Sequence, residues 1–511
     1  MLNFMDSLKM IHAAGIVENY ALVMLIVYLT DVWGSGIIQA FGWIKMLFGI
    51  TKAMPFAILF LMDHNYIGSY SMLIISTTAS ALGMGFLSIS TPSWLYTRIT
   101  GSCGEYKMKC ISETQLSLFY WALILILIGR SARQATMETL NFKGNANERE
   151  LKKHFVTSGS YFAVLHPSLL VFAPWSIIFG ISSICSSLAV FLLMGKSWSH
   201  KLYINKPERS PVTSVLRVFM ATILKINQKL PYESAFLFKE IDQDNSSLRG
   251  RSSLRFLEKA AIEPPNGKGR RLNRWTLCNF QEVEDAKTLV RMLPVGLMFA
   301  FLVLINSIAS VYFLQQAKRL KPLSVYGIEV VNMSNLIFFY ISAKEELHKE
   351  GRNYNRMLQN KEKLFRGVKE ALIHAIIYCV VAALVEKSRL SVIRKHGLAY
   401  RPDHEIIPMT IFWFFPQAFV LGRFYGILER IVRISLAEEM PLPMRNLKKF
   451  VFDGFVGVGI ISGVVVVYLV GKVSEMGGGA NWFQHDTENR RLDLFYWVLT
   501  VLCILVFIRW K

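Results

Sequence analysis

The chain has 511 residues, of which 53% are hydrophobic and only 18% are charged. This composition excludes an ordinary soluble protein and indicates several membrane-spanning helices, since each span needs about 20 mostly apolar residues. The formal net charge of +21 would suggest nucleic-acid binding in a soluble chain. Here no nucleic-acid-binding motif is present and the excess Lys and Arg lie mainly in loops, so we expect no nucleic-acid partner.

Twelve apolar segments of membrane length follow one another along the chain and predict an all-α membrane fold with twelve transmembrane helices. The fifth segment is short, contains Pro167 and runs almost directly into the sixth, so it could be a hairpin, a kinked span or a truncated one. Basic loops after spans four, six, eight and ten predict that these loops and both termini lie in the cytosol. The segments are residues 10–30, 40–62, 71–92, 115–137, 155–173, 175–195, 289–314, 326–343, 367–386, 406–430, 450–472 and 493–509.

A polar connector divides the twelve spans into two sets of six. We expect an N-terminal six-helix half over residues 1–195, a cytosolic connector over 196–286 and a C-terminal six-helix half over 287–511. Within the connector, apolar residues at helical spacing between Pro211 and Lys229 predict an amphipathic helix at the membrane surface. Two such halves are typical of the major-facilitator fold, although twelve spans also suit a membrane enzyme or a channel.

The reactive side chains favour no enzyme class. The sequence has no metal-ligand cluster, no nucleophile elbow and no membrane-placed His/Asp pair, so we expect neither catalysis nor a bound metal or cofactor. Six cysteines are too few and too scattered for a disulfide framework. Cys103 and Cys110 lie close together in a loop predicted to be outside the cytosol, where they could pair.

The most distinctive stretch runs from Arg255 to Pro294 and contains RFLEKAAIE and then WTLCNFQEVEDAKTLVRMLP. Others are GITKAMPFAILFLMDHNYIGSY from residue 49, AALVEKSRL from 382 and FWFFPQAFVLG from 412. Together they resemble, in order and over nearly the whole chain, the plant nitrate/peptide transporter family, a branch of the proton-coupled oligopeptide transporters. The resemblance implies a major-facilitator fold with alternating access that moves nitrate, peptides or plant hormones, commonly with protons.

The chain departs from this family at the charged residues that couple transport to protons. Family members carry two glutamates three residues apart in span one, followed by a basic residue. Aligned on Tyr28, these positions fall on Ile11, Ala14 and Gly15. The lysine of the family's fourth span falls on Gln134. The family's proton motif is therefore absent from this chain.

Other charged residues lie one helical turn away from the lost positions. Glu18, the only acid of span one, follows Ala14 by four residues. Arg130 precedes Gln134 by four. An uncompensated charge inside the membrane costs at least about 2.5–3.5 kcal/mol, so we predict a Glu18–Arg130 ion pair, with Arg133 in the same site, that replaces the coupling cluster. Alternatively, Arg130 reaches the interface and Glu18 hydrogen-bonds within the bundle.

Polar residues of spans seven, eight and ten are the candidate substrate-binding residues. Asn306 falls where the family's nitrate carriers hold a binding histidine. Its amide can donate a hydrogen bond to an anion but carries no charge. Two Asn residues of span eight lie three apart and can face one cavity. The simpler alternative is hydrogen bonding between helices. The candidates are Asn306 (at the histidine position), Ser307, Glu329, Asn332, Asn335 and Tyr425.

Near the end of span ten, Glu429 and Arg433 lie four residues apart and so side by side on the helix. We expect these two residues to form a salt bridge at a cytosolic gate. The alternative is a solvated helix end.

These features predict a multi-pass secondary transporter that moves nitrate, a peptide or a small organic anion or hormone by symport, with altered or reduced proton coupling. The alternative is a non-transporting or signalling relative that keeps only the scaffold. The expected partners are the lipid bilayer, a small-molecule or anion substrate, and protons. We expect a monomer or weak oligomer in the plasma membrane or the vacuolar membrane.

Overall fold

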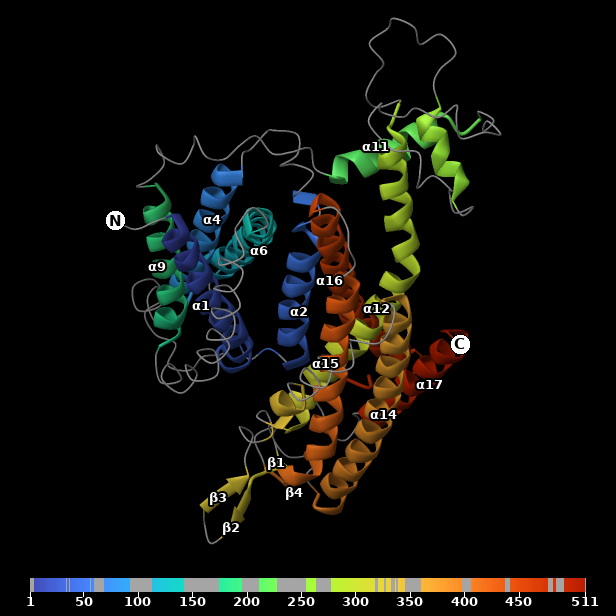
Figure 1. Ribbon diagram of the computed structural model, residues 1–511. Helices are drawn as coiled ribbons and strands as arrows, with labels where there is room; N and C mark the ends of the chain where they lie inside the picture. Colours follow the sequence, from blue (N-terminus) through green and yellow to red (C-terminus); the bar gives the residue numbers. More distant parts are fainter. Residues whose placement is uncertain are drawn as a thin grey trace, which may run out of the picture.

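In the described part of the chain, long α-helices form a bundle and four short strands form two two-stranded sheets (Figure 1). Nine of the described helices are long and apolar enough to cross a membrane, so the chain is a helical, multi-pass membrane protein. A computed structural model describes residues 4–33, 35, 37–55, 57–58, 69–91, 113–141, 174–194, 211–227, 254–262, 277–317, 320–325, 328–331, 336, 339–344, 360–397, 406–436, 442–476, 481–483 and 491–510.

The described helices of the N-terminal half are α1 (Phe4–Asp31), α2 (Ile37–Ala53), α4 (Ser69–Ile89), α6 (Glu113–Asn141) and α9 (Trp175–Met194). Helix α4 packs against both α6 and α9, and α1 packs against α9 (Figure 1). Their buried faces share a core around Tyr28, Phe119 and Phe179. Phe191 on α9 is 73% exposed, as expected of a side chain that faces lipid. The predicted fifth span, residues 155–173, lies outside the described residues, as does the loop with Cys103 and Cys110.

The described helices of the C-terminal half are α12 (Phe280–Ala317), α14 (Asn360–Lys395), α15 (Phe415–Leu436), α16 (Leu442–Glu475) and α17 (Leu492–Trp510). Helix α14 packs against α15 and α17, and α12 packs against α16. Tyr378, Phe424 and Phe495 are fully buried in the shared core. The predicted domain boundary at residue 287 falls inside α12, because the helix continues into polar sequence that hydropathy does not register.

The predicted span eight, residues 326–343, does not begin as a helix. Its first residues form a strand, β3 (Ile328–Val331), which pairs antiparallel with β2 (Leu323–Val325). Among the described residues of this span, helix is present further on, at Leu336 and over residues 339–344. The helical prediction was wrong at this start, because hydropathy does not separate a strand from a helix in a short apolar run rich in β-branched residues.

The predicted span ten, residues 406–430, also begins differently. Strand β4 (Ile407–Thr410) pairs in parallel with β1 (Leu320–Lys321), and a short 3-10 helix, η6 (Ile411–Phe414), leads into α15. The prediction of a continuous helix from residue 406 was therefore wrong. The pairing joins segments far apart in the sequence, and a pattern of apolar residues carries no information about such a partner.

The two halves meet where α2 packs against α16 (Figure 1). The backbones approach closely at this contact. A Cβ atom on Gly457 would lie 2.5 Å from the carbonyl oxygen of Gly49 and 2.7 Å from the amide nitrogen of Ala53. Small residues permit such close helix packing in membranes. At the observed separation of α2 and α16, only glycine fits at position 457.

We expect Gly457→Ala to lower the free energy of unfolding by about 1–3 kcal/mol, because the added methyl group must push α2 and α16 apart. Gly454→Ala on the same helix is the control, since a Cβ there meets no atom within 4 Å and alanine favours helix over glycine. Thermal unfolding of the two purified variants measures the difference. Equal unfolding temperatures would contradict the close packing.

Part of the connector lies at one end of the bundle, which we call the connector side. Helix α11 (Pro211–Leu224), at the position of the predicted amphipathic helix, and the 3-10 helix η4 (Arg255–Ala261) lie there, while the β2–β3 hairpin marks the opposite, hairpin side (Figure 1). Residues of both segments share a buried cluster with Ala132 of α6 and Phe450 of α16. The connector therefore packs against helices of both halves.

Ion pairs reinforce this docking. Lys287 of α12 is fully buried, and its Nζ lies 2.7 Å from Glu258 Oε1 of η4 and 2.6 Å from Glu284 Oε1. Arg217 of α11 lies 3.1 Å from Glu282 of α12. The acidic turn at the start of α12 thus ties η4 and α11 to the helix that opens the C-terminal half.

Two titratable groups are buried where the connector docks. Burial lowers the pKa of Lys225, whose Nζ donates to the carbonyl oxygens of Ala260 and Ile262 at 3.2 and 2.8 Å. Burial raises the pKa of the Cys278 thiol to about 11, so this cysteine stays protonated near neutral pH. Lys225 satisfies the last carbonyl groups of η4, and Cys278 acts as a packing residue.

Candidate functional site

Glu18 of α1 is fully buried and faces two arginines of α6. Arg133 Nη2 donates to Glu18 Oε2 at 2.5 Å, and Arg130 Nη1 lies 3.6 Å from Glu18 Oε1. Arg130 Nη2 also donates to Asn19 Oδ1 at 2.6 Å, and its guanidinium carbon lies 5.2 Å from the centre of the Phe48 ring. The structure therefore brings together the three residues of the predicted ion-pair site, with Arg133 rather than Arg130 in the closer contact.

Two arginines share one carboxylate in this cluster, so it carries a net positive charge in a buried setting. The side chains of Glu18, Arg133 and Arg130 are 0%, 9% and 13% exposed. Arg130 Nη1 and Arg133 Nη1 make no hydrogen bond to a described residue. Glu18 is therefore the shared counter-charge of two buried guanidinium groups, and removal of a charge partner is costly in a low-dielectric site.

A cavity of about 1010 Å³ lies between the two halves. Its walls come from α2 and α6 on one side and from α12 and α16 on the other. The lining is mainly apolar and aromatic, and Lys45 of α2 donates to Ser310 Oγ of α12 at 3.0 Å across the boundary between the halves. Its aromatic residues are Phe41, Trp43, Tyr312, Tyr468 and Phe483.

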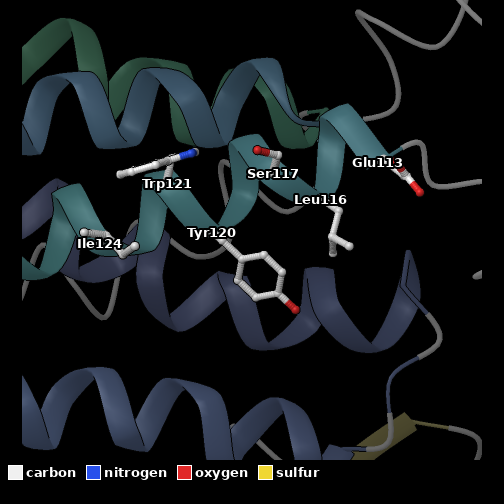
Figure 2. Close-up of a pocket in the computed structure, with 6 residues that line it drawn as sticks. All are labelled: Glu113, Leu116, Ser117, Tyr120, Trp121 and Ile124. Carbon is white, nitrogen blue, oxygen red and sulfur yellow. The ribbon is translucent and has the colours of Figure 1, made fainter.

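A smaller groove of about 390 Å³ runs along α6 toward the hairpin side. Figure 2 shows that its six lining residues all come from this one helix, with Leu116 and Tyr120 pointing to the same side. Ile124 lines both this groove and the larger cavity. Trp121 is 58% exposed, and within the described part of the chain no second helix contributes a polar group to this groove. The larger cavity is therefore the candidate substrate site.

Three side chains cross between the halves beyond the connector-side end of the cavity. Asp453 of α16 lies 3.4 Å from Lys52 Nζ of α2 and accepts a hydrogen bond of 3.0 Å from Gln134 Nε2 of α6. We call Lys52, Gln134 and Asp453 the latch. Sequence reasoning missed Asp453, although a lone acid in an apolar segment is a signal of function or pairing.

Of the six predicted substrate-binding residues, Ser307 lines the cavity. Asn306 is outside its lining, and its Oδ1 is buried without a hydrogen-bond partner in the described part of the chain. Tyr425 of α15 is also outside the lining, and its ring centre lies 4.6 Å from Lys344 Nζ. Glu329 was predicted on a helix and lies instead on strand β3. Asn332 and Asn335 lie outside the described residues.

The predicted gate residue Glu429 has a different partner in the structure. Its Oε1 lies 2.9 Å from Lys344 Nζ, and both residues belong to the C-terminal half. The neighbouring Arg430 pairs with Glu370 of α14. The side chain of Arg433 is not among those described, so a Glu429–Arg433 pair stays a prediction.

A second buried ion pair lies within the C-terminal half. Arg389 of α14 donates from Nε and Nη2 to the two carboxylate oxygens of Glu386, both at 2.7 Å, and Gln316 of α12 donates to Glu386 Oε2 at 2.7 Å. Both charged side chains are buried. The bidentate pair lies within α14, and the hydrogen bond from Gln316 joins it to α12. Among the described residues, no three His, Cys, Asp or Glu side chains are placed to hold a metal ion.

The chain is similar to plant proteins over nearly its whole length. It is 29% identical over 503 residues to Protein NRT1/PTR FAMILY 5.5 of Arabidopsis thaliana, covering 95% of this chain and 91% of that protein. It is 26% identical over 510 residues to Protein NRT1/PTR FAMILY 5.13 of the same plant, covering 94% and 86%. No protein-family model matches the chain.

Solved structures share the fold. The POT family transporter PepTSo superposes with a TM-score of 0.60 at 13% identity, covering 99% of this chain and 96% of that one. A POT family transporter in complex with 5-aminolevulinic acid superposes with a TM-score of 0.53 at 11% identity, covering 100% and 98%.

Fold and site together define the class, a multi-pass membrane protein built as the POT family transporters are. Within this class, the chain is a divergent homologue of the plant NRT1/PTR family proteins. The resemblance predicted from the connector motifs is confirmed. The solved proteins that share the fold are transporters.

Proposed function

We propose that the chain is a secondary transporter that moves a small-molecule substrate through the cavity between its two halves. The supporting observation is a cavity of about 1010 Å³ lined by helices of both halves, with the latch at its connector-side end. In alternating access, one half rocks against the other around the bound substrate. The latch contacts then break when the cavity opens to the connector side.

The proposed substrates are nitrate, a peptide or a small organic anion or hormone. Uptake of labelled nitrate, dipeptides and organic acids by oocytes that express the chain, at acidic and neutral pH, tests this proposal. Accumulation above that of water-injected cells is expected for one of these classes. The same cells, with a fluorescent fusion, distinguish the plasma membrane from an internal membrane such as the vacuolar one.

The second candidate function is a non-transporting or signalling relative. Ile11 and Ala14 favour it, because they stand where the family's proton-coupling glutamates are expected. A current evoked by acidification together with any substrate would exclude this candidate. Absence of uptake and current for every class, with folded protein at the membrane, would favour it over transport.

Any remaining proton coupling is proposed to use the cluster of Glu18, Arg130 and Arg133. Glu18→Gln is then expected to bring the ratio of uptake at acidic pH to uptake at neutral pH to about unity, since an amide cannot take up a proton. Glu362→Gln, at an exposed pair on α14, is the control and should keep the ratio of the parent. If Glu18→Gln leaves the pH dependence of uptake unchanged, coupling through this residue is ruled out.

A further inference from the structure

Lys45 is a cavity-lining cation without a matching acid. In the described part of the chain its one polar partner is Ser310 Oγ, at 3.0 Å, and no carboxylate lies within ion-pair distance. The other lysine of the cavity wall, Lys472, differs because it lies 3.1 Å from Glu475. The described cavity wall therefore presents one uncompensated positive charge, on α2 and next to α12.

The hydrogen bonds around Lys45 leave donors for a ligand. Ser310 Oγ accepts from Lys45 and donates to the carbonyl oxygen of Ser307 at 3.0 Å, so this hydroxyl positions the ammonium group and has no proton left for a ligand. An ammonium group carries three N–H donors. Two of them remain after the bond to Ser310, enough for the two oxygens of one carboxylate.

Apart from Lys45, the cavity wall is suited to contact the apolar part of a ligand. Aromatic and aliphatic side chains dominate its wall, and polar groups buried against such a surface without partners are costly. Glu475 is already bound by Lys472 and by Asn481 Nδ2, at 2.8 Å. The cavity therefore holds no free carboxylate, among the described residues, for the ammonium group of a zwitterionic peptide.

We propose that Lys45 binds the carboxylate of a substrate that carries one negative charge on a largely apolar or aromatic body. This inference rests on the proposed transport function and narrows its substrate class. It also separates organic monoanions from the two other classes considered, since nitrate has no apolar body and dipeptides carry an ammonium group. Lys45 and Ser310 belong to different halves, so the bound carboxylate lies where the halves move against each other.

The test measures equilibrium binding to the full chain in lipid nanodiscs. The probes are phenylacetate, phenylbutanoate and octanoate, each compared with its own primary amide. At least one carboxylate is expected to bind at least about tenfold more tightly than its amide, the size of one hydrogen bond to a charged group. Lys45→Met should weaken the carboxylate to the level of the amide and leave the amide unchanged, while Lys45→Arg should retain the preference.

Lys395→Met is the control, because it removes an exposed lysine in the last turn of α14, outside the cavity lining, and it should keep the preference for the carboxylate. The inference is overturned if no carboxylate binds, if the amide binds equally well, or if Lys45→Met weakens acid and amide alike, as a purely structural contact would. Uptake into proteoliposomes separates it from the transport proposal. If carboxylate binding depends on Lys45 but no uptake occurs, the transport proposal alone is wrong. If nitrate or a dipeptide is taken up and Lys45→Met leaves this uptake unchanged, the inference about Lys45 alone is wrong.

Discussion

Replacement of Lys287 by methionine is expected to lower the free energy of unfolding by about 3 kcal/mol. Lys287 is fully buried, and its ammonium group is the shared partner of Glu258 and Glu284. Methionine keeps most of the volume but leaves two carboxylates facing each other without a counter-charge, and removal of one member of a buried ion cluster is strongly destabilising. Unfolding by heat or denaturant in detergent micelles measures the change.

The control for this variant is Lys472→Met. Lys472 pairs with Glu475 at the same three-residue spacing as Glu284 and Lys287, but its side chain is 59% exposed. Exposed pairs contribute about 0–1 kcal/mol, so this variant should unfold close to the parent. A triple variant that also carries Glu258→Gln and Glu284→Gln should recover part of the loss. Equal stability of the two lysine variants would contradict the inference that the ion pairs of Lys287 stabilise the packing of the connector against α12.

Glu386→Gln is expected to cost about 3–5 kcal/mol of stability, the range for breaking a buried pair by removing one partner. Arg389 is 1% exposed and donates both of its bidentate hydrogen bonds to Glu386. The amide that replaces the carboxylate carries no charge and accepts through one oxygen only, so the guanidinium group stays buried and uncompensated. Thermal unfolding, followed by loss of monodisperse protein, is the measurement.

Helix α14 supplies its own control for this prediction. Glu362 pairs with Arg366 on the same helix, but both side chains are about half exposed, at 49% and 53%, so Glu362→Gln should change stability by less than about 1 kcal/mol. Glu386→Leu combined with Arg389→Met removes both charges and should be more stable than Glu386→Gln alone. If the double variant is instead the less stable of the two, the buried pair contributes net stability beyond its desolvation cost.

Much of the scaffold could be predicted from the sequence, because a membrane span is a property of one segment. Ten described helices coincide with predicted spans, and α11 lies where an amphipathic helix was expected. The errors lie at the starts of spans eight and ten, where β3 and β4 replace helix. Short apolar runs fit both structures, and the choice between them depends on strand partners elsewhere in the chain.

The candidate site was less accessible to sequence reasoning. The pairing of Glu18 with Arg130 could be predicted because each residue lies one helical turn from a position where the family carries a charge, and the helical repeat is regular. The closer contact, to Arg133, depends on how α6 is rotated against α1. Of the residues proposed to bind substrate, Ser307 lines the cavity, whereas Lys45 gave no signal beyond being a charge in an apolar segment.

The class of protein, a multi-pass membrane chain with the connector motifs of the nitrate/peptide transporters, could be identified from the amino-acid sequence, because hydropathy and short motifs are local properties. Which polar and charged side chains meet depends on the packing of the helices. Lys45 and Ser310 are 265 residues apart, and Gln134 and Asp453 are 319 apart. Each pair joins opposite halves, so its contact depends on how the two helical units dock, and no local pattern in either segment encodes that geometry.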